Sequence, residues 1–300
     1  MRVLVTGARG FVGSHALHSL VQAGLEVHAL SRHPPRGADG AVSWHQGDLL
    51  STGGPETVVS AVRPTHLLHL AWVTEHGTYW SSPDNALWLE ASRALARAFH
   101  ANGGRRFVGV GTCAEYDWSG GVCDEQNTPL RPRTVYGRAK AAFGEELLTF
   151  PGSAWARPFF VYGPGEQPQR LVPSITATLS RGETAHCRTG KLRRDFIYVA
   201  DCASALVRLL QSEEPGAFNV ATGTAVAIEE IVLAIATALH AEDRVIINEP
   251  SEGADEDALV VGTTGRIRSL GWSPVWDLRA GIEESIARTY ASENQPHEIH

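Results

Sequence analysis

Three glycines near the N-terminus constrain the fold of this chain more than any other feature of its sequence. The segment VTGARGFVGSH places Gly7, Gly10 and Gly13 after the apolar run RVLVTG and before a stretch with helical spacing. In such a strand–turn–helix unit, the glycines permit a tight turn, a close approach of the backbone to a pyrophosphate, and close packing of helix on strand. The free N–H groups at the start of the helix favour the phosphates. The segment therefore predicts a dinucleotide site, and the residues beside the glycines that we expect at the cofactor are Arg9, Phe11 and Val12.

The first half of the chain alternates between short apolar runs and segments with helical periodicity. We expect strands at 2–7, 26–32, 42–48, 66–72, 106–112 and 154–163, and helices at 11–24, 83–100 and 134–150. This rhythm is typical of parallel strands joined by helical crossovers. The sequence therefore predicts an α/β fold with a doubly wound, Rossmann-like parallel sheet, whose ligands lie beyond the carboxyl ends of the strands.

The second half is less regular. It reads as a short strand and a helix over 193–212, a helix over 228–240, and short mixed elements near the end. We expect residues 1–165 to form the dinucleotide-binding domain, with later contributions from about 195–235. Residues 166–194 and 236–300 are expected to form a smaller mixed α/β lobe that binds substrate.

The end of the second predicted strand indicates which dinucleotide binds. An acidic residue there would accept hydrogen bonds from the ribose 2′-hydroxyl and repel a 2′-phosphate. This chain has Ser31 and Arg32 instead, and Arg9 lies in the glycine turn. Guanidinium groups suit a phosphate, although Arg32 could simply be solvated. We therefore expect NADP(H) rather than NAD(H), which stays the alternative.

The segment TVYGRAKAAF places Tyr136 and Lys140 four residues apart at the start of a predicted helix, and hence on one face of it. An ordinary surface pair is the simplest interpretation. The alternative is a proton donor and its tuning charge, since a free phenol has a pKa near 10 and a nearby ammonium or an oxidised nicotinamide ring lowers it.

Composition excludes several other classes of protein. The chain has 26 basic and 33 acidic residues, a net charge of −7, and no basic run of five, which disfavours a nucleic-acid partner. Its four cysteines form no C-x-x-C pair and its 13 histidines no metal-binding spacing, so we expect neither disulfides nor a metal. There is no apolar run of membrane-spanning length and no signal peptide, so we expect a cytoplasmic protein without membrane association.

Several motifs appear in one order over residues 2–225: TGARGFVGSH, GDLL, LLHLAW, VGVGTCAEYD, YGRAK, RPFFVYGPGE and RRDFIYVADCASAL. In these motifs the chain resembles the extended short-chain dehydrogenase/reductase family of nucleotide-sugar epimerases, dehydratases and reductases. The resemblance implies that Tyr136 is the catalytic acid/base, Lys140 its partner, and Thr112 the hydroxyl that polarises the substrate carbonyl. It implies that Tyr136 and Lys140 also contact the cofactor, with Lys140 holding the ribose. Further implied cofactor contacts are Asp48, Leu49, Leu70, Ala71 and Pro158. The implied substrate-binding candidates are Cys113, Glu115, Tyr116, Phe160, Arg170 and Arg194.

Some of these candidates keep a simpler interpretation. Glu115 is either a second acid or a solvated side chain. Tyr116 lacks a lysine four residues on and reads as a pocket-wall residue, and Cys113 is more consistent with a small buried filler than with a reactive thiol. Arg170 and Arg194 are phosphate anchors or solvated side chains.

Departures from the family pattern narrow the expected reaction. Phe160 replaces an asparagine common in relatives that bind nucleoside diphosphates, and the segment EPSEGADED lacks a second phosphate-binding arginine. Cys113 and Ala114 stand where dehydratases carry an Asp-Glu pair, which disfavours dehydration. Relatives with tightly bound NAD usually carry the acid that is missing after the second strand.

We therefore expect NADP(H)-dependent reduction of a nucleotide-linked 4-keto-6-deoxy sugar. The alternative is a nucleotide-sugar 4-epimerase with tightly bound NAD. A non-catalytic nucleotide-sensing regulator is less consistent with the Tyr136–Lys140 pair. The resemblance also implies a homodimer, paired through the predicted helices at 83–100 and 134–150.

Overall fold

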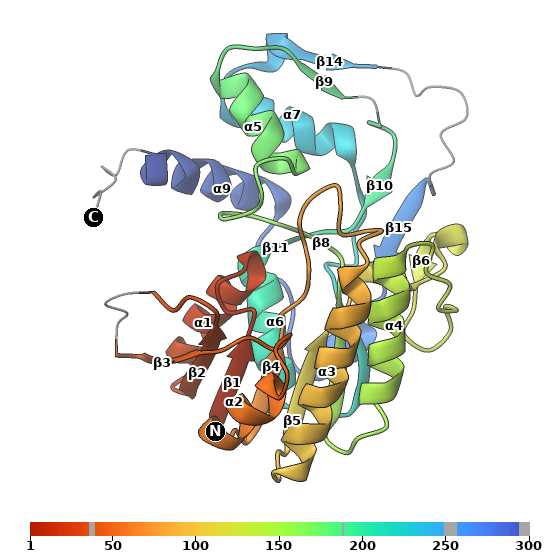
Figure 1. The fold of residues 1–300 in the computed structure, drawn as a ribbon. Coiled ribbons are helices and arrows are strands. Elements are labelled where there is room, and N and C mark those ends of the chain that lie inside the picture. The colour runs from red at the N-terminus through yellow and green to blue at the C-terminus, as the bar shows by residue number, and fades with distance from the viewer. Residues whose placement is uncertain (36–39, 188, 249–256, 294–300) are drawn as a thin grey trace.

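A parallel sheet forms the centre of the computed structural model, which describes residues 1–35, 40–187, 189–248 and 257–293 (Figure 1). Its strands in spatial order are β12 (Gly216–Val220), β7 (Ser153–Pro158), β5 (Arg106–Val110), β4 (His66–His69), β1 (Arg2–Thr6), β2 (Glu26–Ser31) and β3 (Val42–Gln46). Strands β4 and β5 are buried at every residue, as expected of parallel strands covered on both faces. The chain order reverses between β1 and β4, which is where ligands bind in open sheets of this type. The predicted doubly wound sheet is confirmed.

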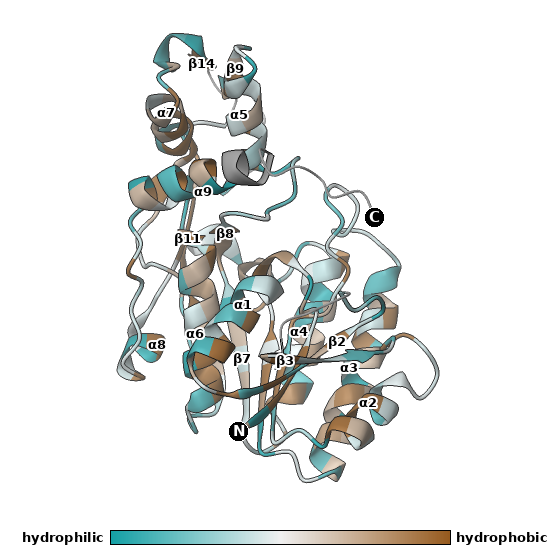
Figure 2. Ribbon diagram, turned by 90° about the vertical axis from the view of Figure 1, so that its left-hand side faces the viewer, coloured by the Kyte–Doolittle hydropathy of each residue, from teal (hydrophilic) through white to brown (hydrophobic). Residues whose placement is uncertain are grey.

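Two layers of helices enclose the sheet. The helices of one layer are α1 (Phe11–Gln22) and α6 (Val199–Gln211), and those of the other are α2 (Gly54–Val62), α3 (Asp84–Ala101) and α4 (Val135–Leu147). Each layer closes its own apolar core against the sheet. In Figure 2 the hydrophobic colouring follows the strands between the layers, while hydrophilic residues mark the outer surface of helices such as α6. No helix in the described ranges is both long and apolar enough to cross a lipid bilayer.

A smaller lobe lies beyond the carboxyl end of the sheet (Figure 1). Its helices are α5 (Leu171–Ser180), α7 (Ile228–Ala238) and α9 (Leu278–Glu293), and β9 (Ala185–Cys187) pairs with β14 (Val245–Ile247). Two small sheets lie between this lobe and the central sheet. One pairs β11 (Phe196–Tyr198) with β8 (Phe160–Tyr162). The other has the strand order β13 (Val226–Ala227), β10 (Arg193–Arg194), β15 (Leu259–Gly262) and β6 (Val122–Cys123). Short elements complete the chain: η1 (Cys113–Glu115), η2 (Trp118–Gly120), η3 (Glu242–Arg244) and α8 (Gly265–Ser269).

Several elements differ from the sequence-based expectation, among them helix α5, which was not predicted. The strand expected at 154–163 is two strands in different sheets, because Pro158 cannot donate to the ladder and Phe160 N donates to Asp195 O at 3.0 Å instead. Helix α2 was not predicted, although Pro55 in its first turn is a helix-start signal. Strand β12, which completes the sheet beside β7, was also not assigned.

Candidate functional site

The glycine turn between β1 and α1 has the geometry that a dinucleotide needs. Gly7 has φ +69°, and a Cβ added there would lie 2.6 Å from Ala71 N, at the end of β4. A Cβ at Gly13 would lie 2.1 Å from the Gly7 carbonyl oxygen, so helix α1 can pack on the turn only with glycine there. Gly10 is exposed, and a Cβ there would meet only the Gly7 oxygen, at 3.2 Å. Packing therefore requires Gly7 and Gly13, while the surface above Gly10 is open to a pyrophosphate at the start of the helix.

The other expected cofactor residues lie at or just after the carboxyl ends of strands of the same sheet, or at the start of α1. Leu70 and Ala71 follow β4 and contact Gly7, and Phe11 and Val12 open α1. Pro158 ends β7 and is buried. Asp48 follows β3, where its carboxylate accepts from Leu50 N at 3.0 Å, and Leu49 is buried beside it.

Polar and basic groups mark the carboxyl end of β2. The Ser31 hydroxyl accepts from His33 N at 3.1 Å, and Arg9 Nη1 donates to His33 O at 2.5 Å. Arg32 is exposed, and its carbonyl accepts from Gln46 Nε2 at 3.2 Å. The Arg9 contact therefore joins the glycine turn to the end of β2, which is the position in the fold where a ribose-binding carboxylate stands in NAD-binding sheets.

Thr112 and Tyr136 are brought together at the carboxyl end of β5. Thr134 caps α4, its hydroxyl accepting from Gly137 N at 3.0 Å, and this places Tyr136 in the first turn of the helix. The Thr112 side chain lies close enough to the phenol to act on its pKa. The rings of Tyr79 and Trp80 lie edge-on to the Tyr136 ring, with centroids 5.0 and 5.6 Å away.

Burial is the largest influence on Tyr136 and raises its pKa, with Tyr79, Glu115 and Cys113 acting in the same direction. The Thr112 side chain opposes this rise in the pKa of Tyr136. The expectation of a lowered pKa for Tyr136 is therefore wrong for the protein's own groups, because burial outweighs the opposing influences, and the contribution of Lys140 itself stays a prediction. The phenol is held protonated at neutral pH, as a proton donor must be.

Lys140 lies deeper in the site than the sequence indicates. Its ammonium donates to Val110 O at 2.7 Å and lies 3.9 Å from the centroid of the Trp72 ring. Burial lowers the pKa of Lys140 to about 7, and Glu115 opposes that change. The simple interpretation as a surface pair is therefore wrong, because Tyr136 and Lys140 are both buried.

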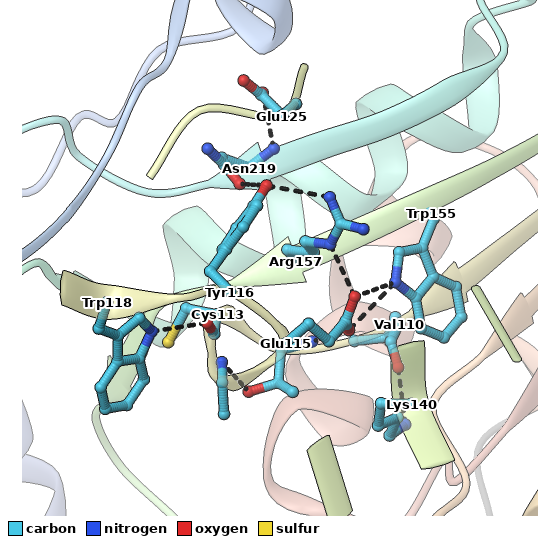
Figure 3. A network of polar contacts seen from close by, with 12 residues as sticks. Val110, Cys113, Glu115, Tyr116, Trp118, Glu125, Lys140, Trp155, Arg157 and Asn219 are labelled. Carbon is cyan, nitrogen blue, oxygen red and sulfur yellow. Dashed lines mark hydrogen bonds and ion pairs between the residues drawn. The ribbon is translucent and has the colours of Figure 1, made fainter. Parts of the chain in front are cut away.

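Glu115 is in the interior, neither solvated nor on a pocket wall (Figure 3). Its side chain has no exposed surface, and its carboxylate accepts from Arg157 Nε at 2.7 Å. Trp155 Nε1 donates to both carboxylate oxygens, and Thr112 N donates to Oε1 at 2.8 Å. The expected place of Glu115 at the substrate is therefore corrected: its ligands are the protein's own donors.

Tyr116 is also interior, which corrects its interpretation as a pocket-wall residue. Its hydroxyl donates to Asn219 Oδ1 at 2.8 Å and accepts from Arg157 Nη1 at 3.0 Å (Figure 3). Cys113 is buried in a small apolar cluster with Cys123 and Phe159, and burial raises the pKa of its thiol. The Cys113 thiol therefore fits the filler interpretation better than the reactive one.

The remaining substrate candidates lie on the side of the smaller lobe. Arg194 is buried, lies over the rings of Trp118 and Phe160, and donates to Asp257 O at 2.8 Å, so it is not a solvated side chain. Phe160 is half-buried in β8. Arg170 lies over the Tyr79 ring, 5.7 Å from its centroid. Most of the segment EPSEGADED (249–256) falls outside the described residues.

Sequence reasoning missed Trp72, Trp155 and Arg157, which all contact catalytic candidates or their supports. Arg157 had a visible signal, since it is a charged residue within a run expected to be a buried strand. The signal for Trp155 was weaker, because an indole in a strand is ordinary core composition.

Comparisons with known proteins agree with this site. The family model described as the NAD dependent epimerase/dehydratase family matches residues 3–221. A UDP-glucose 4-epimerase of Rhizobium meliloti is 28% identical, over 98% of both chains, and a CDP-abequose synthase of Salmonella typhimurium is 26% identical, over 95% of this chain and 97% of that protein.

Solved structures show the same relationship. The crystal structure of the Thermus thermophilus UDP-glucose 4-epimerase in complex with NAD is 27% identical and matches with a TM-score of 0.85, over 97% of this chain and 100% of that one. Together, these findings support the expected extended short-chain dehydrogenase/reductase type for this chain. With the matched segment running from β1 to the end of the sheet, the chain belongs to the NAD dependent epimerase/dehydratase family.

Proposed function

We propose that this protein is an NADP(H)-dependent reductase of a nucleotide-linked 4-keto-6-deoxy sugar. The observation that carries the proposal is the end of β2, where Arg9 donates to His33 O, the Ser31 hydroxyl accepts from His33 N, and residues 32–35 include an exposed Arg32 and no acidic residue. A 2′-phosphate suits such a cluster. The substrate class follows from the family resemblance and from relatives named for UDP-glucose and CDP-abequose.

The residues of the site divide the work of a reduction among them. Gly7, Gly10 and Gly13 would hold the pyrophosphate at α1, and a bound nicotinamide would supply hydride. The Thr112 hydroxyl would donate to the carbonyl oxygen of the sugar, and Tyr136 would then transfer its phenolic proton to that oxygen. Because burial keeps Tyr136 protonated, the protein's own electrostatics favour proton donation over proton abstraction.

A 4-epimerase with tightly bound NAD is the second candidate. It is favoured by the relatives, several of which are named UDP-glucose 4-epimerase, and by solved relatives in complex with NAD. Such an enzyme would return the hydride to the sugar. Purified protein incubated with NADPH and a panel of nucleotide-linked 4-keto-6-deoxy sugars decides between the two: a stoichiometric loss of NADPH absorbance supports the reductase, and a changed sugar without net loss supports the epimerase.

Cofactor preference is the first testable consequence. We expect NADPH to bind more tightly than NADH, and Arg32→Glu to lower the affinity for NADPH by about tenfold, because a charged hydrogen-bond partner is lost. Fluorescence titration with both nucleotides measures this. The control is Arg279→Glu, the same charge change on an exposed side chain of α9. An NADH affinity above that for NADPH in the unmodified protein would overturn the assignment.

We also infer that two copies pair through the outer faces of α3 and α4. These helices pack against each other, and Leu87 on α3 is 57% exposed. Light scattering should give a mass near twice 32.3 kDa. Leu87→Glu should shift the mass toward one chain, because a buried carboxylate without a partner is disfavoured at an interface. A single-chain mass for the unmodified protein would refute the pairing.

A further inference from the structure

We propose that Glu115 is a positioning residue that holds Thr112 in place, and that Arg157 and Trp155 in turn hold Glu115. The inference rests on the proposed function, because the catalytic roles of Thr112 and Tyr136 are assigned there. It adds a residue that does not touch the substrate yet determines where a catalytic hydroxyl lies.

The turn η1 shows how Glu115 acts on Thr112. Thr112 N donates to Glu115 Oε1 at 2.8 Å, and the Thr112 hydroxyl accepts from Ala114 N at 3.2 Å. The two bonds close a capping box around Cys113–Glu115. The same turn thus fixes both the backbone and the side chain of Thr112. The carboxylate of Glu115 accepts one of the two hydrogen bonds that do so.

The position of that carboxylate is fixed from all sides. Figure 3 shows it between the Trp155 indole and the Arg157 guanidinium, both on β7. A Cβ added at Gly111 would lie 2.1 Å from Glu115 Oε1, so the residue before Thr112 must be glycine for the carboxylate to fit. A fully buried carboxylate with this set of donors is held in a single position, and a positioning residue needs that property.

The same indole reaches the helix that carries Tyr136 and Lys140. A Cβ added at Gly144 of α4 would lie 2.6 Å from Trp155 Cε2, and the ring of Phe143 packs edge-on to the indole at 5.5 Å. Trp155 therefore contacts α4 on one side and donates to Glu115 on the other. Trp155 thereby fixes the position of α4, which carries Tyr136, relative to η1, which Thr112 caps.

Glu115 also acts on both titrating groups of the site through its charge. The carboxylate raises the pKa of Tyr136 and opposes the lowering of the pKa of Lys140. The other titratable or charged groups around this set are Tyr79, Cys113, Tyr116, Arg157 and, beside Lys140, His69. If the Glu115 charge is removed, both pKa values fall.

The test is Glu115→Gln in the full-length protein, read out in two ways. The first, independent of any substrate, is amide hydrogen exchange of residues 111–116, which should become faster by about tenfold because a bond to a charged acceptor is weakened. The second is NADPH oxidation with the sugar panel. There we expect kcat to fall by about tenfold or more with little change in KM for NADPH, since misplacement of a catalytic group affects turnover more than cofactor binding.

The pH profile separates positioning from a general loss of stability. A proton-donating Tyr136 must be protonated and Lys140 must be charged, and both conditions fail as pH rises. Because the pKa values of both groups fall without Glu115, the alkaline limb of the kcat profile should move to lower pH in Glu115→Gln. A purely structural role for Glu115 would leave that limb in place.

The matched control is Asp201→Asn on α6. Asp201 is a buried carboxylate that likewise holds backbone, accepting from Val275 N and Trp276 N at 3.1 and 3.0 Å, and its helix lies in the layer on the other face of the sheet from α4. Asp201→Asn should make amide hydrogen exchange near residues 274–277 faster and leave the alkaline limb of the kcat profile unchanged. If Glu115→Gln does not fold, the double variant Glu115→Gln/Arg157→Gln removes both charges and takes its place in the same measurements.

Failure of this inference can be told from failure of the proposed function. If Tyr136→Phe keeps full turnover, the proposed function is wrong, and the exchange experiment still reports whether Glu115 holds the turn. If Tyr136→Phe abolishes turnover while Glu115→Gln keeps the exchange rate, kcat and alkaline limb of the unmodified protein, the inference is overturned and the proposed function stands.

Discussion

Tyr136→Phe should lower kcat by roughly 10²–10⁴-fold, which is the contribution expected of a positioned proton donor. The substitution removes only the hydroxyl, and the ring can keep its edge contacts with Tyr79 and Trp80. We therefore expect the stability of the protein and its affinity for NADPH to change little. Steady-state NADPH oxidation, together with a cofactor titration, measures both.

Tyr116→Phe separates the two tyrosines near Thr112. The Tyr116 hydroxyl is engaged by Arg157 and Asn219, so its removal should lower the free energy of unfolding rather than take away the proton donor. If the larger loss of kcat followed Tyr116→Phe, the assignment of Tyr136 as the donor would be wrong.

Arg157→Ala should lower the free energy of unfolding by about 3–5 kcal/mol, because it leaves the Glu115 carboxylate buried without its cation. The side chains of Arg157 and Glu115 are 5% and 0% exposed, so water cannot replace the lost partner. Urea denaturation followed by tryptophan fluorescence measures the change. In a Glu115→Gln background the same substitution should cost much less, since no charge is then left unpaired.

The exposed ion pair of Arg279 and Glu283 on α9 supplies the comparison. Its side chains are 81% and 51% exposed, so solvent screens the pair and Arg279→Ala should change stability far less than Arg157→Ala. Equal losses from the two substitutions would show that the buried pair is not an electrostatic support of the site.

Local patterns were enough to predict the features that depend on neighbouring residues. The glycine turn, the alternation of strands and helices, and the i, i+4 pair of Tyr136 and Lys140 all lie within short windows of sequence. The structure has all three, with the glycine turn and the Tyr136–Lys140 pair at the carboxyl end of the sheet. The glycines at positions 7 and 13 can be recognised in the sequence for a physical reason, since a side chain at either position would overlap backbone atoms.

Features that depend on tertiary partners could not be predicted in the same way. Glu115 was left open as an acid or a solvated side chain, because its burial is possible only with Arg157, 42 residues away along the chain. The pKa of Tyr136 was expected to fall, since a sequence shows the nearby lysine but not the extent of burial. The split of the expected 154–163 strand depends on β11 and β12, which come more than 30 residues later.

The order in which the sheet is completed has a consequence for the newborn chain. The face of the sheet covered by α6 has all its strands except β12 by Pro158, yet α6 ends only at Gln211. At ribosomal rates of about 5–20 residues per second, that apolar face lacks its cover for roughly 3–10 s of each synthesis. The interval ends when α6 docks on the sheet and buries Ala203, Leu206 and Leu210, which are fully or almost fully buried in the folded protein. Until then the nascent chain exposes a surface that a chaperone can bind and that another nascent chain can stick to.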